Sequence, residues 1–294
     1  MPDESGVASI APTEPVTIAV LLTCYNRREH TLACLDSIHA NAVAGVSVNV
    51  YLVDDASTDG TAEAVAVAYP DVHVSVSSGD LFWGGGMRLA FNRAVPASPD
   101  FLLWINDDVT LYPDALARLL IASNAIPAEQ RERSIVVGSS RDPITGETTY
   151  GGVERTDRLR RMAFSLIEPK DTVQPCETMN GNIVLVPRSV YQILGNIDRR
   201  FTHAMGDYDY GLRAGVAGCH VFIAPGHLGT CRLNLAVGSF FDTQLSRRER
   251  IRLAFSPKGL PPAQWATLCR RYAGPLWPAN ALLPYVRMMV QRRR

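Results

Sequence analysis

Short polar clusters follow four apolar segments of the chain. The clusters are 23–26 (Thr-Cys-Tyr-Asn), 54–60 (rich in Asp, Ser and Thr), 106–108 (Asn-Asp-Asp) and 206–209 (Gly-Asp-Tyr-Asp). Carboxylates gathered at one edge of a sheet repel one another unless a cation or hydrogen-bond donors lie between them. Oxygen-rich groups of this kind suit a hard divalent cation that also contacts a diphosphate. The clusters therefore predict a site for a metal-bridged diphosphate ligand.

Two common phosphate-binding motifs are absent from the sequence. A dinucleotide fingerprint needs glycines directly after the first strand, and a Walker P-loop needs its own glycine and lysine pattern. The turn after the first apolar run reads TCYNRREH and contains no glycine, and the Walker consensus does not occur. The site must therefore use a different nucleotide-binding chemistry.

Strand and helix signals alternate through the first 125 residues. Apolar runs of strand length occupy 16–23, 46–53, 72–76 and 101–106. Helical signals follow these runs at 32–38, at 61–68, near Gly86 and from Pro113. Apolar strands that alternate with helices favour an α/β fold with a mostly parallel central sheet and helices on both faces. Ligands bind such sheets where the strands end, which is where the polar clusters lie.

The alternation weakens after about residue 135. Residues 142–147 are typical of a turn, 182–187 and 220–225 of strands, and 208–216 of a short helix. We therefore predict a catalytic domain over 16–240, with a nucleotide-binding half at 16–125 and an acceptor-binding half at 126–240.

The two ends of the chain differ from its middle. Residues 1–15 are acidic and proline-containing and lack the basic, apolar layout of a signal peptide, so we expect a disordered leader. Residues 247–294 carry 11 Lys or Arg and one acid, so this tail has a charge of +10 and the rest of the chain −10. We expect 241–294 to form a basic and apolar, helical extension. Its two alternative roles are peripheral contact with an anionic membrane and burial against the catalytic domain.

The composition excludes several classes of protein. Hydrophobic residues make up 47% and charged residues 20%, which is ordinary for a globular chain and excludes wholesale disorder. The six cysteines form no C-x-x-C pair, so we expect reduced thiols and a cytoplasmic location, with peripheral contact at the inner face of the membrane as an option. Prolines at 275, 278 and 284 break the apolar stretch 272–290, so we expect no spanning helix there.

The ordered motifs TCYNR, VDDASTDGT, NDDV and GDYDYGLRA resemble those of the family 2 glycosyltransferases. The resemblance covers roughly residues 16–240 and implies the GT-A fold. The segment GNIDRRFTHAMGDYDYGLRA is similar to bacterial, rhamnosyltransferase-like enzymes that build surface polysaccharides of the cell envelope. The chain is therefore expected to be an inverting, metal-dependent transferase.

The resemblance implies a metal site. Asp108 matches the ligand of a divalent ion, Mn or Mg, and Asp107 matches a residue near the ribose or the metal shell. His227 stands near a position that can complete the shell. The alternative for the acid pair is a helix N-cap before Pro113. The role of Asn106 is open, because many relatives carry another residue type there.

The resemblance also implies a donor site. Asp55 matches the residue that faces the nucleotide base, and a carboxylate that accepts from a ring N–H favours uracil or thymine. The remaining donor-binding residues implied are Thr23, Tyr25, Asn26, Gly84, Gly85 and Arg88. The alternatives are strand-end packing for Tyr25, a flexible turn for the glycines and a solvent-facing side chain for Arg88. Asp59 and Gly60 are expected to cap the next helix.

Asp207 matches the catalytic aspartate of the family's ED motif, although Gly206 stands where the glutamate is usual. Inverting transfer needs one carboxylate to remove the proton of the acceptor hydroxyl. The residues expected on the acceptor side are Trp83, Asn180, His203 and Asp209. The alternative for Asp209 is a structural pair with Arg213 four residues later.

These motifs predict transfer of a sugar from a nucleoside-diphosphate donor, with UDP or dTDP favoured. The expected acceptor is a hydroxyl of a glycan or of a polyprenyl-linked glycan, and no nucleic-acid partner is expected. One alternative is a sugar nucleotidyltransferase, but such enzymes usually carry glycines where TCYNRREH has none. The other alternative is a non-catalytic nucleotide-sugar-binding scaffold, against which the presence of both Asp108 and Asp207 argues.

Overall fold

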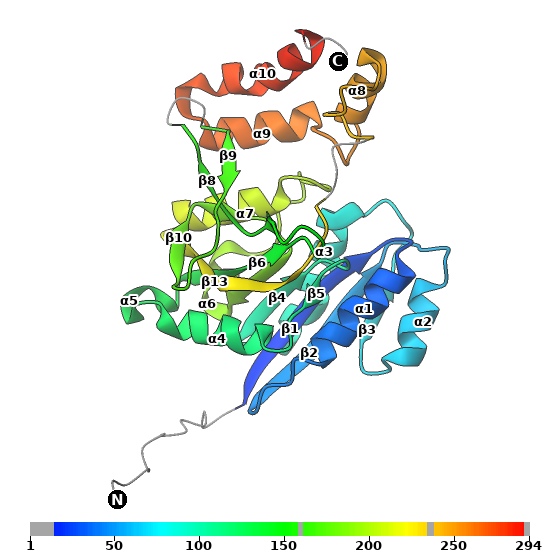
Figure 1. The fold of residues 1–294 in the computed structure, drawn as a ribbon, viewed down its shortest axis with the longest axis vertical. Coiled ribbons are helices and arrows are strands. Elements are labelled where there is room, and N and C mark those ends of the chain that lie inside the picture. The colour runs from blue at the N-terminus through cyan, green and yellow to red at the C-terminus, as the bar shows by residue number, and fades with distance from the viewer. Residues whose placement is uncertain (1–14, 158–160, 234–237, 291–294) are drawn as a thin grey trace, which may run out of the picture.

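The computed structural model describes residues 15–157, 161–233 and 238–290 (Figure 1). The leader expected over 1–15 lies outside the described residues except for Pro15, and so do the last arginines of the tail, 292–294. The chain ends in a layer of helices on the far side of the molecule from the N-terminal end of the sheet (Figure 1).

Strands and helices alternate in the first part of the chain, as predicted. The elements are β1 (Val16–Cys24), α1 (Arg28–His39), β2 (Val46–Asp54), α2 (Thr61–Ala68), β3 (His73–Val76), α3 (Phe82–Ala94), η1 (Val95–Ala97), β4 (Phe101–Ile105), β5 (Thr110–Leu111) and α4 (Ala115–Ala125). Helix α3 begins at Phe82 rather than near Gly86. The three glycines 84–86 therefore lie inside a helix, so the alternative of a flexible turn is wrong.

The second part is richer in short strands. Its elements are α5 (Ala128–Arg131), β6 (Ser134–Arg141), β7 (Thr148–Tyr150), β8 (Gly152–Arg155), β9 (Phe164–Leu166), β10 (Gln174–Cys176), β11 (Thr178–Met179), β12 (Ile183–Pro187), α6 (Arg188–Leu194), α7 (Gly206–Val216), β13 (His220–Thr230), α8 (Arg247–Ala254), α9 (Pro262–Tyr272), η2 (Gly274–Leu276) and α10 (Trp277–Val290).

Ten strands of the described chain form one sheet in the order β10-β13-β6-β12-β4-β1-β2-β3, with β5 and β7 paired at its side. Strand β1 is parallel to β2 and β4, and β2 is parallel to β3. Strand β12 is antiparallel to both β4 and β6. Strand β13 is parallel to β6. The sheet is thus mixed: its pairs are all parallel from β4 to β3, and both directions occur beyond β4. Parallel neighbours need a crossover, usually a helix, and helices α6 and α7 lie between β6 and β13 along the chain.

Each face of the sheet has its own hydrophobic core. Ile18, Val20 and Leu22 of β1 join a core that includes residues of α1, α2 and α4. Ala19 and Leu21 point the other way, into a core shared with α3, α6 and α7. This alternation is the two-residue period of a strand that is buried on both faces. The expectation of helices on both faces is confirmed.

The C-terminal layer packs against the loop that precedes α7. Leu268 of α9 clusters with Phe201 and Met205, and Trp265 and Tyr272 pack around them. Of the two roles considered for the tail, burial therefore holds for α9. The segment 272–290 is divided among the end of α9, the turn η2 and α10, although Pro284 lies inside α10 without ending it. In the part of the chain that the structure describes, no helix is long and apolar enough to span a bilayer.

Candidate active site

The ends of the parallel strands bring three of the four polar clusters together. Cys24 of β1 pairs with Asp54 of β2, and Leu21 of β1 pairs with Trp104 of β4. Since these strands run in the same direction, the loops that follow them leave the sheet at one edge. The structure thus confirms that the clusters 23–26, 54–60 and 106–108 meet.

The acid pair faces an arginine. Arg27 Nη1 lies 3.0 Å from Asp107 Oδ1 and 2.7 Å from Asp108 Oδ2. Burial raises the pKa of Asp107 to about 6, and the charge of Arg27 opposes that rise. Arg27 therefore offsets part of the negative charge of the acid pair. Sequence reasoning missed this residue, although Arg27 directly follows the first polar cluster and leads into α1.

The acid pair does not cap a helix. Helix α4 begins at Ala115 and its N-cap residue is Asp114, so the alternative of an N-cap role for Asp107 and Asp108 is wrong. Asp108 instead contacts Cys231, whose Sγ lies 3.4 Å from Asp108 Oδ1 just beyond the end of β13. Its carboxylate is held at the strand-end edge on two sides.

His227 lies earlier on β13 and has other partners. Its Nε2 is 2.7 Å from Thr148 Oγ1 and 3.8 Å from a carboxylate oxygen of Glu168. The residue that strand β13 places against Asp108 is thus Cys231 and not His227. Within residues 15–157, 161–233 and 238–290, no group of three or more His, Cys, Asp or Glu side chains forms a ready metal cage. A metal bound by Asp108 would need oxygen atoms of a bound molecule, such as a diphosphate, to complete its coordination shell.

Asp55 is buried, and its carboxylate accepts hydrogen bonds at the start of α3. Its Oδ1 accepts from Ser77 Oγ at 2.6 Å and from Leu81 N at 3.1 Å, and its Oδ2 accepts from Phe82 N at 2.9 Å. These bonds satisfy N–H groups at the start of α3. The separate expectation for Asp59 is confirmed, since its carboxylate accepts from Thr61 N at 3.1 Å at the start of α2.

The loop after β1 is fixed to the loop after β2. Asn26 has a φ of +51°, and its Oδ1 accepts from Thr58 N at 2.7 Å. The neighbouring Tyr25 is 53% exposed, so its ring is available for stacking on a base and the alternative of strand-end packing is not what the structure shows. Thr23 is half-buried and packs against Gly86. Thr23, Tyr25 and Asn26 thus lie together at the end of β1 and in the loop that follows it.

The glycines of α3 permit close packing. A Cβ on Gly84 would lie 2.4 Å from the carbonyl oxygen of Phe201, and one on Gly86 would lie 2.0 Å from Thr23 Oγ1. Gly85 is also inside the helix and buried. The same helix carries Arg88, whose guanidinium donates to the Phe201 carbonyl at 2.9 Å. Arg88 therefore does not simply face solvent. Its hydrogen bond and the close contact of Gly84 hold α3 against the loop that leads to α7.

Asp207 lies in the first turn of α7 and accepts two backbone hydrogen bonds. Gly181 N donates to its Oδ2 at 3.0 Å and Tyr208 N to its Oδ1 at 2.9 Å. Burial raises the pKa of Asp207 above the ordinary range for an aspartate. A raised pKa makes a carboxylate a better proton acceptor, which suits a general base.

Trp83 connects the acid pair to Asp207. Its Nε1 donates to Asn106 Oδ1 at 2.8 Å, next to the acid pair in sequence. Its ring also lies against Gly181 and Gly206, where an added Cβ would come within 2.6 Å and 3.4 Å of it. Asn106, whose role the sequence left open, thus holds Trp83. The indole of Trp83 thus contacts both the strand-end edge, at Asn106, and the start of α7, at Gly206.

Two other residues expected on the acceptor side lie near this region. Asn180 Oδ1 accepts from Gly151 N at 3.3 Å, and the Asn180 side chain also bonds the Tyr208 hydroxyl. The ring of His203 lies edge-on to Phe82, and its Nδ1 is buried with no hydrogen-bond partner among the described residues. Burial, with a smaller effect of Lys258, lowers the pKa of His203 to about 4.

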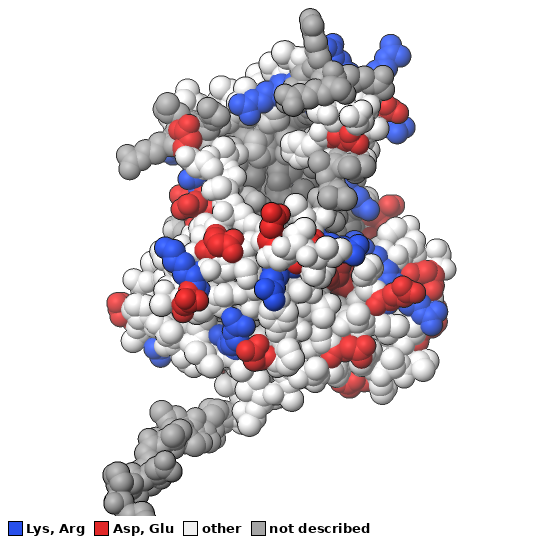
Figure 2. Space-filling model, in the orientation of Figure 1, with Lys and Arg blue, Asp and Glu red and all other residues white. Residues whose placement is uncertain are grey.

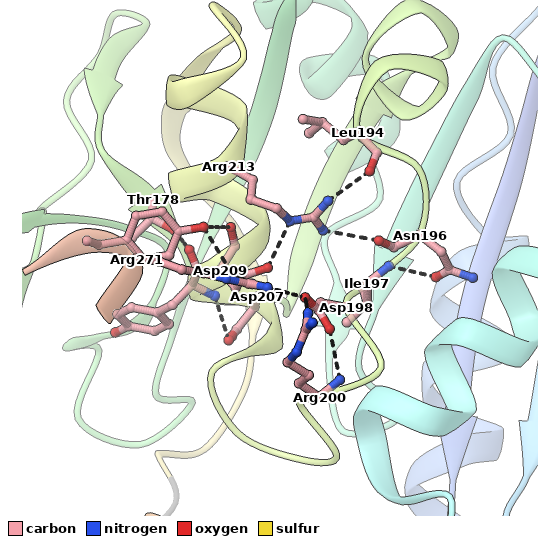
Figure 3. A network of polar contacts seen from close by, with 12 residues as sticks. Thr178, Leu194, Asn196, Ile197, Asp198, Arg200, Asp207, Asp209, Arg213 and Arg271 are labelled. Carbon is pink, nitrogen blue, oxygen red and sulfur yellow. Dashed lines mark hydrogen bonds and ion pairs between the residues drawn. The ribbon is translucent and has the colours of Figure 1, made fainter. Parts of the chain in front are cut away.

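Asp209 belongs to a structural network (Figure 3). Its side chain is completely buried and accepts from Arg213 at 2.8 Å, Arg271 at 2.6 Å and the Tyr272 hydroxyl at 2.9 Å. Arg271 also donates to Asp198 at 2.6 Å. The expected pair with Arg213 is confirmed, and the placement of Asp209 on the acceptor side is corrected. Sequence reasoning missed Arg271, because α9 is far from α7 along the chain.

The chain is an α/β protein with acidic residues at the ends of its parallel strands. A profile described as "Glycosyl transferase family 2" matches residues 19–191, more than half of the chain, and the chain belongs to that family. The chain is 26% identical over 195 residues to the N-acetylglucosaminyl-diphospho-decaprenol L-rhamnosyltransferase of Mycobacterium tuberculosis. That match covers 58% of this chain and 62% of the relative, which is less than two thirds of the relative's length.

Solved glycosyltransferases have the same fold, which confirms the expected GT-A architecture. GalNAc-T7, solved with UDP, GalNAc and Mn2+, superposes with a TM-score of 0.57 at 13% identity, over 72% of this chain and 43% of its own. Residues 1–349 of S. aureus TarS give 0.56 at 12% identity, over 92% and 73%. The mannosyltransferase PcManGT of Pyrobaculum calidifontis, solved with GDP-Man and Mn2+, gives 0.54 at 16% identity, over 95% and 71%.

Proposed function

We propose that this chain is a metal-dependent, inverting glycosyltransferase. It transfers a sugar from a nucleoside-diphosphate donor to a hydroxyl of a glycan or polyprenyl-linked glycan in polysaccharide biosynthesis. The observation that carries the proposal is the arrangement around Trp83. The indole N–H of Trp83 donates to Asn106, the residue before the acid pair Asp107 and Asp108. The ring also lies against Gly181, whose backbone N–H donates to the carboxylate of Asp207. The donor diphosphate needs one group of residues to bind it, and the acceptor hydroxyl needs a different carboxylate to accept its proton.

In the proposed reaction, Asp207 accepts the proton of the acceptor hydroxyl as its oxygen attacks the anomeric carbon of the donor sugar. A new bond forms between that oxygen and the carbon, and the bond from the carbon to the diphosphate oxygen breaks. The nucleoside diphosphate leaves with the electron pair of that bond. A divalent ion, when bound, offsets the charge that develops on the diphosphate. Asp108 is the proposed protein ligand of that ion. Asp107 binds Arg27 and so holds this arginine next to Asp108.

The structures solved with Mn2+ support the proposal of a divalent ion, since this chain has their fold. We propose Asp55 and Tyr25 as the residues that face the base, with UDP or dTDP favoured. Thr23, Asn26, Gly84, Gly85 and Arg88 are proposed to border the donor. Trp83, Asn180 and His203 are proposed to border the acceptor. The mycobacterial relative's decaprenol-linked acceptor supports a lipid-linked acceptor here.

We further propose that residues 16–240 form the catalytic unit and 241–294 an extension that contacts a membrane from the cytoplasmic side. Support for the division is the packing of α9 on the loop before α7, which makes the extension a separate layer on the catalytic fold.

The experiment is a panel of UDP-, dTDP- and GDP-sugars incubated with the full chain, with and without Mn2+. We expect Mn2+-dependent release of nucleoside diphosphate from at least one UDP- or dTDP-sugar, and its loss in Asp207→Asn. Exchange of pyrophosphate into a nucleotide sugar would instead indicate a sugar nucleotidyltransferase. Binding of a donor without any turnover, with or without acceptor lipids, would indicate a scaffold.

A further inference from the structure

Helix α10 turns an apolar face outward. It forms the outermost helix of the C-terminal layer, and its inner side packs on α9, where Ala281 clusters with Cys269 and Ala273 (Figure 1). The side chains on its other side are exposed: Leu282 by 63%, Val286 by 46%, Met289 by 53% and Val290 by 71%. Spacings of three and four residues put them on one helical face. A helix at a water-covered surface normally presents polar residues there, so this face is built for a different neighbour.

Helix α8 lies beside α10 and adds positive charge to the same layer. Arg247, Arg248 and Arg252 are exposed on it, as are the apolar Ile251 and Phe255. Its acid, Glu249, is the only one in 247–294 and is engaged in a capping box with Ser246. Figure 2 shows Lys and Arg side chains around the C-terminal layer, with some acidic side chains among them.

We infer that the outer side of α8 and α10 docks on an anionic lipid surface. We define the docking face by Phe255, Leu282, Val286 and Met289 with Arg248 and Arg252. Apolar side chains that enter the headgroup region, flanked by arginines that contact anionic headgroups, are the two elements of interfacial binding. The face lies on the membrane and does not cross it, because the 14 residues of α10 extend about 21 Å and a bilayer core is about 30 Å thick.

The charge of the docking face favours a membrane over a second copy of the chain. Two copies would bring their basic helices together, and like charges across an interface are unfavourable. An anionic bilayer complements the same arginines. The tail that contains the face also carries the whole positive excess of the chain, +10 against −10 elsewhere.

Docking has a use if the acceptor is lipid-linked, and in that respect the inference rests on the proposed function. Helix α9 lies under α10 and holds α7 through Arg271 and Asp209. The docked layer would therefore hold the helix that carries Asp207 at a fixed distance from the bilayer, where a lipid-linked acceptor lies.

The test is flotation of the full chain with vesicles of phosphatidylcholine alone or with 30–40% phosphatidylglycerol (about the anionic content at which basic clusters bind) in low and high salt. Truncation of the tail is unsuitable, because it would uncover Phe201 and remove Arg271. The double variant Leu282→Glu/Val286→Glu removes the apolar part of the face. Its matched control is Val67→Glu/Ile144→Glu, since both of these residues are exposed on other parts of the surface. Arg248→Gln/Arg252→Gln tests the charge, with Arg93→Gln/Lys170→Gln as its control.

We expect the wild type to bind only the anionic vesicles, and binding to weaken in high salt. The Leu282/Val286 variant should lose at least about tenfold in partitioning. The Arg248/Arg252 variant should lose roughly 10- to 30-fold, and both controls should bind like the wild type. Absence of wild-type binding at low salt would overturn the inference, and so would variants that bind as well as their controls. A lipid-free dimer that the Leu282/Val286 variant abolishes would assign the face to a second copy. Donor hydrolysis measured without lipid separates failure of docking from failure of the proposed function.

Discussion

The strand-end edge and the junction of α7 with α9 are built by different kinds of contact. At the edge, Arg27 and the acid pair come from loops that follow β1 and β4, two strands that are neighbours in a parallel sheet. At the junction, Asp209 of α7 is held by Arg271, 62 residues later in the chain. The edge follows from the strand pattern, whereas the junction depends on how a separate helical layer packs. Both regions hold buried carboxylates beside arginines, and at the junction both carboxylate oxygens of Asp209 are bonded within the chain.

The largest effect is expected from the junction side of the site. Asp207→Asn keeps the shape of the side chain but cannot accept a proton, so kcat should fall by roughly 10²- to 10³-fold. In the wild type the raised pKa of Asp207 should move the acidic limb of the kcat profile above the ordinary range for an aspartate, because the protonated form is inactive. Steady-state rates across pH check this, and donor affinity should be unchanged. Wild-type rates in Asp207→Asn would remove this residue from catalysis.

The variant with the next largest expected effect tests whether the C-terminal layer positions α7. Arg271→Met leaves Asp209 buried with one of its two arginines gone, so the free energy of unfolding should fall by about 2–3 kcal/mol. If Arg271 positions Asp207, kcat should also fall by roughly tenfold with the KM for donor unchanged. Arg200→Met is the control, since Arg200 also contacts Asp198 but is 60% exposed, and it should cost about 0.5 kcal/mol or less. Equal behaviour of the two variants would make the junction a simple packing contact.

A third variant asks what Arg27 does at the edge. Arg27→Met leaves two neighbouring carboxylates without their cation and should lower the free energy of unfolding by about 2 kcal/mol, a value discounted because Arg27 is partly exposed. Mn2+ should then raise the melting temperature of the variant more than that of the wild type, because the ion replaces the missing charge. A smaller metal-induced shift in the variant would mean that Arg27 helps to hold the ion instead.

The smallest effect concerns His203, whose folded pKa is about 4 against an ordinary 6.5. Protonation below pH 6.5 therefore favours the unfolded chain, and stability is lost as the pH falls from 6.5 toward 4. At pH 5 the expected loss is about 1–2 kcal/mol relative to neutral pH. Urea titrations of the wild type and of His203→Gln check this, and the variant should lose less. Parallel pH dependence of the two proteins would contradict the assigned burial.

The sequence predicted the edge better than the junction for physical reasons. Continuous apolar strands identify a parallel sheet, and their ends must meet, so the neighbourhood of Asp55 and Asp108 could be read from the sequence. The antiparallel direction of β12 could not be predicted from the sequence, because an apolar run has the same pattern in either direction. Gly84 was expected to lie before the helix, since glycine is unfavourable in a helix, but its close approach to Phe201 requires the missing Cβ. Arg271 carried no local signal at all, because its partners are fixed only by packing between layers.

The central claim is that Asp108 binds a divalent ion together with the donor diphosphate, and calorimetry with UDP or dTDP tests it most directly. Wild type and Asp108→Ala are titrated with and without Mn2+. We expect Mn2+ to strengthen nucleotide binding by the wild type at least about tenfold, this gain to disappear in Asp108→Ala, and the variant to have no measurable turnover. Equal nucleotide affinity in all four titrations would remove Asp108 from the metal site.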